Sequence, residues 1–206
     1  MIAADSVEKF LDDLAGSAPT PGGGSAAAIM GAMGAALISM VCNVTLGKKN
    51  QDAVEMQSVR AESEKLRARL TAMVAEDVAA FDGLMAAYRL PKSSDEEKTR
   101  RNEAIQRSLR EATETPLACA RACAEVIALS QRAGEHGYAG VISDAGVGVL
   151  AANTALRSAA LNVYINAPSL KDRVFADQAV AEVEALQAAG AKITESVFAQ
   201  VRGRLG

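Results

Sequence analysis

The chain has 206 residues and is 50% hydrophobic, but only 3% of its residues are aromatic and it contains no tryptophan. This length predicts one domain, residues 1–206, with a sizeable core of small aliphatic side chains. A net charge of −3 without a long basic run argues against nucleic-acid binding. No secretory signal is visible, and the cysteines lack the spacing of disulfide or zinc sites, so we expect a cytoplasmic protein without a metal. The cysteines are Cys42, Cys119 and Cys123.

Three helices are predicted in the first half of the chain. The first covers residues 6–14 and is capped by Ser6. The second starts at the glycines of residues 22–24 and ends on Gly47, with lysines at its end. The third covers residues 51–89 and is very long, on the order of 60 Å at about 1.5 Å per residue. A Leu-Pro pair then ends it.

The fourth predicted helix, residues 94–131, contains a proline. Ser94 and Glu97 have the spacing of a capping box at its start. Pro116 has no N–H to donate, so it should bend the helix and leave the carbonyl of Ala112 without its helical partner.

Two more helices complete the pattern. The glycine-rich segment 134–140 is predicted to be the one long flexible connection. A small-residue helix follows and ends near Asn166, and the last helix covers residues 169–202. No segment alternates in the manner of a strand, and no repeat is present. The sequence therefore predicts an all-α, mostly antiparallel bundle of about six helices, one of them very long.

Two of these helices raise the alternative of a membrane protein. Residues 26–46 form a stretch of 21 positions without a charge, long enough to cross a bilayer. Residues 145–166 are similar, apart from Arg157. Both are rich in alanine, glycine and polar residues, and the mean hydropathy of the chain is only +0.08. We interpret them as central helices of a soluble bundle that does not contact a membrane.

The glycines at the start of the second helix form a candidate binding site. Gly22, Gly23, Gly24 and Ser25 lie where a helix has unsatisfied N–H groups and a positive dipole. Such a helix start can hold a carboxylate, an oxyanion or a ring carbonyl, and glycine lets the backbone approach closely. The alternative is a turn that merely starts a packing helix. The spacing excludes the common nucleotide-binding glycine motifs.

One face of the third helix contains a single charged side chain, Asp77. Seven positions at helical spacing form this face, and all the others are apolar or aromatic. A carboxylate in such a row must be paired, hydrogen-bonded or solvated. It could cap a neighbouring helix or pair with a lysine, or it could line a cavity as a general base. The seven residues are Leu66, Leu70, Met73, Asp77, Phe81, Leu84 and Tyr88.

Several other polar residues are weaker candidates. Asp82 lies one position off the apolar face, so solvent exposure is its simplest role, with a secondary substrate contact as the alternative. Tyr88 could pack in the core or stack on a planar ring. Asp144 is a candidate N-cap. Asn162 and Asn166, one helical turn apart, form either a solvated row or a row that binds a ligand.

The remaining candidates follow predicted helix ends. Lys48, Lys49 and Lys92 lie where a positive charge complements the helix dipole. His136 is the sole histidine, between glycines, and we expect an ordinary loop residue although its pKa range suits proton transfer.

Four blocks of the sequence, in order, resemble the cyclodeaminase/cyclohydrolase family. This family includes the cyclodeaminase half of formiminotransferase-cyclodeaminase and the stand-alone methenyltetrahydrofolate cyclohydrolases, and the resemblance to the stand-alone enzymes is the greater. Residues 134–140 depart from the family pattern, which more often has an asparagine-containing stretch there. The four blocks are PTPGGGSAAA…GAMGAAL…NVTLGKK, DVAAFDGLMAAYRLPK, ATETPL and SDAGVGVLAANTALRSAALNVYIN.

The resemblance implies hydrolysis of 5,10-methenyltetrahydrofolate to 10-formyltetrahydrofolate, with no metal or redox cofactor. Asp77 matches the aspartate that the family is thought to use as acid and base. Asp144 would accept hydrogen bonds from the 2-amino-4-oxopyrimidine ring, and Asn162 and Asn166 would contact the pterin or the p-aminobenzoyl amide. The glycine run would contribute to the site, and the three lysines could bind the glutamate carboxylates. A homodimer with its site at or near the subunit contact is also implied.

Two alternatives remain at this point. One is the neighbouring reaction, in which formimidoyltetrahydrofolate cyclises with loss of ammonia, in the same pocket. The other is a non-catalytic helical protein that binds a partner through its small-residue helices, although this gives no reason for Asp77 to lie in an apolar row.

Overall fold

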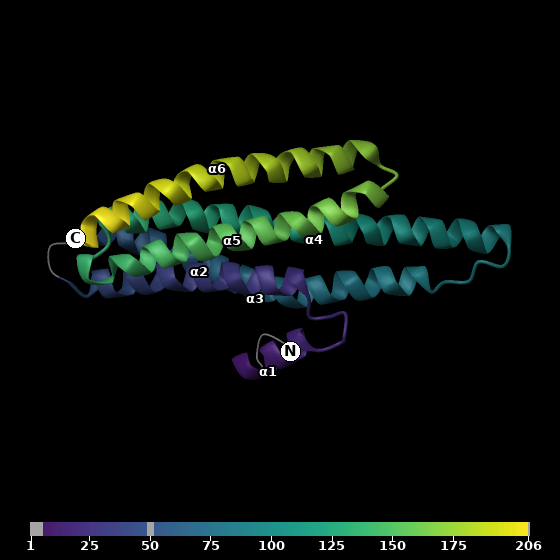
Figure 1. The fold of residues 1–206 in the computed structure, drawn as a ribbon, viewed down its shortest axis with the longest axis horizontal. Helices are drawn as coiled ribbons and strands as arrows, with labels where there is room; N and C mark the ends of the chain where they lie inside the picture. The colour runs from purple at the N-terminus through teal and green to yellow at the C-terminus, as the bar shows by residue number, and fades with distance from the viewer. Residues whose placement is uncertain (1–5, 49–51, 206) are drawn as a thin grey trace.

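The computed structural model describes residues 6–48 and 52–205. The described residues form six α-helices and two short 3₁₀ helices, and no strand occurs among them, so the predicted all-α class is confirmed. Five long helices lie side by side along one axis, and α1 lies outside them (Figure 1). The bounds are α1 Val7–Ala15, α2 Gly23–Leu46, α3 Ala53–Tyr88, α4 Asp95–His136, η2 Ala139–Val141, α5 Ile142–Asn166, η3 Ala167–Ser169 and α6 Arg173–Leu205.

Two of the predicted helix starts, at Ser6 and Ser94, are confirmed by their capping hydrogen bonds, whereas the last helix begins at Arg173 and not at residue 169, where η3 ends. Ser6 Oγ accepts a hydrogen bond from the backbone N–H of Lys9 at 3.1 Å. Ser94 and Glu97 form both halves of the capping box. Each bond satisfies a donor that the first helical turn would otherwise leave without a partner.

The prediction of a long flexible connection at residues 134–140 is wrong. Helix α4 continues to His136, and η2 follows after only two residues. Arg204 of α6 explains this extension, because its guanidinium donates hydrogen bonds to the backbone carbonyls of Gly134 and Gly137. These carbonyls belong to the helix end, where a cation is stabilising.

The small residues of α2 and α5 let these two helices approach closely. A Cβ atom at Gly34 would lie 2.9 Å from the carbonyl oxygen of Gly148, closer than such atoms pack. On another side of α2, Gly31 faces Leu70 and Cys123 in the same way. All three cysteines are buried and unpaired.

Helices α2 and α5 are also long and apolar enough to cross a membrane, judged by length and composition alone. In the bundle, 61% of the most apolar 18-residue stretch of α2 is buried, against 44% of the corresponding stretch within Ala139–Ser169. Large apolar side chains remain exposed on these two neighbouring helices, and we call them the α2/α5 face. They are Met33, Val147, Leu150, Leu161 and Ile165.

Unequal helix lengths shape one end of the bundle. Helix α2 begins at Gly23, and Gly24 faces Asp77 of α3. Helix α3 continues past this point to Tyr88, about 16 Å further at about 1.5 Å per residue. Helices α3 and α4 therefore extend beyond α2, α5 and α6 (Figure 1). Without α2 to cover it, this last part of α3 borders an open space.

Candidate active site

Asp77 meets the first turn of α2. Its Oδ2 atom accepts a hydrogen bond from Ser25 Oγ at 2.7 Å, and its carboxylate also accepts one from the Ser25 backbone N–H. Ser25 is fully buried. Helix α2 has only Gly22 at its N-cap position, without a side-chain cap. The carboxylate of Asp77 therefore supplies the cap, which was one of the roles predicted for it, and it forms no ion pair within the described residues.

Gly24 makes this approach possible. A Cβ atom at Gly24 would overlap the Asp77 carboxylate. Gly22 has extended backbone, and the described residues contain no glycine with positive φ. The glycine run therefore serves close contact and not an unusual turn. At Gly23 a Cβ atom would meet only Asn162 Nδ2, at 3.9 Å.

Burial raises the pKa of Asp77 above its ordinary value of 3.8, while its hydrogen bonds from Ser25 act in the opposite direction. A carboxylate without a neighbouring cation gains little compensation for lost water. The result is a stronger base than an exposed aspartate, in a position that a ligand can reach.

Asp77 lines a cleft of about 400 Å³ at the uncovered end of α3. The walls come from α3, α4, the end of α5 and η3. They combine apolar and aromatic groups with a few polar ones, a typical composition for a ligand site. The lining residues are Asp77, Ala80, Phe81, Leu84, Met85, Tyr88, Leu109, Ala112, Thr115, Pro116, Asn162, Ile165, Asn166 and Ser169.

The asparagines of α5 line this cleft, and their amides have defined partners. Asn166 Nδ2 donates a hydrogen bond to the carbonyl of Ala112 at 2.7 Å, so this carbonyl is not left free. Asn162 Nδ2 donates to the carbonyl of Ser158 at 3.0 Å. Helix α4 continues through Pro116 as one helix.

Two of the residues predicted on or near α3 lie away from the cleft. Asp82 is exposed and does not line it, because one residue after Phe81 the helix has turned by about 100°. Lys92 is exposed in the connection between α3 and α4. Tyr88 lines the cleft and remains 41% exposed, with the guanidinium of Arg101 6.0 Å from its ring centre.

Two other predicted residues, Asp144 and Lys48, lie at the end of the bundle opposite to the cleft. Asp144 is separated along α5 from Asn162, which lines the cleft, by about 27 Å, at about 1.5 Å per residue. Asp144 is also not the N-cap, because η2 leads directly into α5 and Val141 caps it. Lys48 follows α2 at this far end, 4.8 Å from the ring centre of Tyr138, and not in the last turn of the helix. Lys49 lies outside the described residues.

Sequence reasoning assigned no role to Thr115, Pro116 or Ala112 in the cleft. Thr115 lies beside Asp77, and its hydroxyl donates a hydrogen bond to the Glu111 carbonyl at 3.0 Å. The signal was present in the ATETPL block, but only the packing of α4 against α3 and α5 shows which side of that block faces the cleft.

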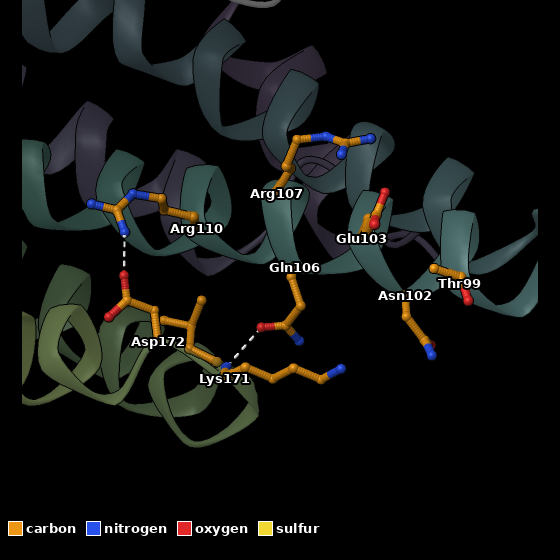
Figure 2. Close-up of a pocket in the computed structure, with 9 residues that line it drawn as sticks. Thr99, Asn102, Glu103, Gln106, Arg107, Arg110, Lys171 and Asp172 are labelled. Carbon is orange, nitrogen blue, oxygen red and sulfur yellow. Dashed lines mark hydrogen bonds and ion pairs between the residues drawn. The ribbon is translucent and has the colours of Figure 1, made fainter.

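A larger groove of about 630 Å³ lies between α4 and the start of α6 (Figure 2). Arg110 forms an ion pair with Asp172 across it, and Gln106 accepts a hydrogen bond from the Lys171 backbone. Its charged side chains are exposed, and it contains none of the residues predicted from the sequence. We therefore assign the site to the smaller cleft with the half-buried carboxylate. Among the described residues, no cluster of three or more His, Cys, Asp or Glu side chains could hold a metal ion.

Comparison with known proteins identifies the family. The model of the formiminotransferase-cyclodeaminase family matches residues 6–185. The chain is 54% identical to methenyltetrahydrofolate cyclohydrolase of Methylorubrum extorquens over the full length of both. It is 34% identical to rat formimidoyltransferase-cyclodeaminase over 84% of this chain and 32% of that protein. The crystal structure of formiminotetrahydrofolate cyclodeaminase from Thermotoga maritima superimposes with a TM-score of 0.89, at 27% identity and full coverage of both chains. The chain therefore belongs to the formiminotransferase-cyclodeaminase family.

Proposed function

We propose that the protein is an enzyme that hydrolyses 5,10-methenyltetrahydrofolate to 10-formyltetrahydrofolate. The observation that carries the proposal is Asp77, a half-buried carboxylate that has no cation beside it among residues 6–48 and 52–205, in a cleft of about 400 Å³. The 54% identity to a methenyltetrahydrofolate cyclohydrolase over the whole chain supports this choice of substrate.

The substrate carries a positive charge delocalised over N5, the bridging carbon and N10. Asp77 removes a proton from a water molecule as the water oxygen adds to the bridging carbon. Its negative charge also stabilises the substrate cation in a site with little water. The tetrahedral intermediate then breaks its bond to N5, which receives a proton from the Asp77 carboxyl, while the intermediate's hydroxyl group loses its proton to the regenerated carboxylate or to solvent as the formyl C=O bond forms. The first proton of the water thus ends on N5, the second is released, and the formyl group stays on N10.

The test is the Asp77→Asn variant, followed by the absorbance of the methenyl group. Loss of a general base lowers turnover roughly 100- to 10,000-fold, whereas the helical circular-dichroism signal should not change. Glu76→Gln is the matched control, since Glu76 is the neighbouring carboxylate but is exposed and paired with Arg69. Turnover of Asp77→Asn close to that of the unmodified protein would remove Asp77 from the mechanism.

A second candidate is the ammonia-releasing cyclisation of formimidoyltetrahydrofolate. The Thermotoga maritima structure of a formiminotetrahydrofolate cyclodeaminase, which this chain matches along its full length, favours it. The same carboxylate could move the proton in both reactions. An ammonia-release assay beside the methenyl assay separates the two. If calorimetry detects no binding of either reduced folate, the non-catalytic interaction protein becomes the better interpretation.

We further propose a cytoplasmic homodimer that pairs through the α2/α5 face. This face carries several large apolar side chains that are exposed, such as Leu161 at 67% and Ile165 at 74%. An isologous pair with its two-fold axis near the middle of α5 would run the two copies of α5 antiparallel. The Lys48 and Asp144 end of one copy would then adjoin the Asp77 cleft of the other. Three buried free thiols suit a reducing compartment.

Mixing two inactive variants tests this shared site. If Asp144 serves the partner's cleft, Asp77→Asn and Asp144→Asn dimers regain activity when their subunits exchange, because each mixed dimer has one intact site. Random exchange gives roughly a quarter of the original activity. A mixture that stays inactive after exchange, shown by tagged subunits, would place both residues in the same chain's site or Asp144 outside it.

A further inference from the structure

Three polar side chains around Asp77 each donate a hydrogen bond to a backbone carbonyl. Asn166 Nδ2 donates to Ala112 at 2.7 Å, and Asn162 Nδ2 donates to Ser158 at 3.0 Å. The Thr115 hydroxyl donates to Glu111 at 3.0 Å. Each of these groups therefore has one carbonyl partner. The threonine hydroxyl can then only accept a further hydrogen bond, whereas each asparagine amide keeps its oxygen and one N–H.

No lysine or arginine lines this cleft among the residues that the structure describes. Asp77 is the one charged side chain among the described lining residues, and the neutral polar ones are Tyr88, Thr115, Asn162, Asn166 and Ser169. A site with one carboxylate and no cation among the described residues favours a ligand that brings a positive charge and disfavours one that brings anionic oxygens.

Pro116 determines the orientation of the Asn166 amide. In an uninterrupted helix, the carbonyl of Ala112 would accept a hydrogen bond from the N–H of residue 116, and proline has none. The carbonyl is half-buried and can only accept, so it requires a donor from elsewhere. Asn166 supplies that donor from α5. If the amide turned over, two oxygens would face each other, so the amide oxygen is kept free of the Ala112 carbonyl and stays available to a ligand, beside the second N–H of Nδ2.

From this arrangement we propose that Pro116 is a positioning residue for ligand recognition. By withholding its N–H from Ala112, it fixes Asn166 with its amide oxygen available to the cleft. The cleft then selects a planar, cationic ring that presents N–H groups. The identification of that ring as the tetrahydropterin of a methenyl substrate rests on the function proposed above. The positioning of Asn166 by Pro116 does not.

A double-mutant cycle tests the proposal. Pro116→Ala gives Ala112 a helical donor and frees the amide to turn, and Asn166→Ala removes the amide. Each single variant should raise the KM for methenyltetrahydrofolate roughly five- to tenfold, with kcat less affected, as expected for one hydrogen bond to a ligand. Since both changes act through the same amide, the double variant should have the KM of Asn166→Ala alone. The control Asn102→Ala, an exposed asparagine on the same helix α4 as Pro116, should keep the original KM.

Independent effects, in which the two increases in KM multiply, would overturn the proposal, because Pro116 would then act through the shape of α4. The melting temperatures of the same four proteins give a second readout that needs no substrate. Asn166→Ala should lower the melting temperature when residue 116 is proline, and much less when it is alanine. If Asn166→Ala lowered the melting temperature equally with proline and with alanine at position 116, the positioning role of Pro116 would also be overturned. If the unmodified protein binds no methenyltetrahydrofolate but the thermal cycle is coupled, the proposed function fails and the positioning role stands.

Discussion

Glu55 and Asp77 are carboxylates on the same helix, Glu55 in its first turn and Asp77 about two thirds of the way along it, and their surroundings differ. Glu55 accepts a hydrogen bond from Arg132 Nε at 2.6 Å, and Arg132 also binds Glu62. The hydrogen bond from Arg132 lowers the pKa of Glu55, whereas burial raises the pKa of Asp77. Glu55 is stabilised by its partner and has no need of a ligand. Asp77 is held in place by Ser25 but keeps a charge that a cationic ligand could neutralise. Glu55 therefore serves to join helices α3 and α4, whereas Asp77 is available for chemistry.

The largest effect expected from a change beside Asp77, as opposed to a change of Asp77 itself, tests the close contact that holds its carboxylate in place. Gly24→Ala places a Cβ atom where the Asp77 carboxylate lies. The carboxylate must move, and a displacement of about 1 Å can lower turnover on the order of 100-fold. The measurement is kcat for loss of the methenyl group. Gly23→Ala is the matched change one residue earlier, with a much smaller expected loss because its Cβ would meet only Asn162, at 3.9 Å. Equal losses of kcat in Gly24→Ala and Gly23→Ala would show that the contact between Gly24 and Asp77 is not what positions the carboxylate.

A smaller effect is expected at the other end of the helix. Arg132→Ala leaves Glu55 and Glu62 without their shared cation, which should cost about 1 kcal/mol of unfolding free energy, since the pairs are partly exposed. Urea denaturation measures this cost. The lowered pKa of Glu55 means that its stabilisation is present above the pKa of an unfolded glutamate and is lost as pH falls through the folded value. The unfolding free energies of Arg132→Ala and of the unmodified protein should therefore become equal in acid. At neutral pH the kcat of the variant should be unchanged.

The smallest expected effect is a gain in stability, and it comes from the substitution Asp77→Asn. Because the pKa of Asp77 is raised, its contribution to stability is fully present below the unfolded value of 3.8 and is lost as pH rises through the folded value. At neutral pH the charged form therefore lowers stability. Asp77→Asn should melt slightly higher than the unmodified protein at pH 7, with the difference shrinking as pH falls. Melting curves across this range check it, and a variant that melts lower at pH 7 would show that capping of α2 outweighs burial.

The helices were predictable because their signals are local. Ser94 and Glu97 lie three residues apart, and the capping box that they predict forms as expected. The end of α4 was not predictable, since Arg204, 70 residues after Gly134, binds the carbonyls that extend it. Asp144 illustrates the same limit. Its place three residues into α5 depends on η2, a feature without a strong sequence signal.

By itself, the sequence determined that Asp77 is the exceptional member of an apolar helical face, because the spacing of side chains on a helix is fixed by its geometry. It also determined that Pro116 withholds a hydrogen bond from Ala112. Only the tertiary structure shows that Asp77 and the Ala112 carbonyl belong to the same cleft. Helix α2 starts beside Asp77, and Asn166 of α5 reaches Ala112, so one cleft contains both. Such contacts depend on the packing of residues more than 50 positions apart, which no local pattern specifies.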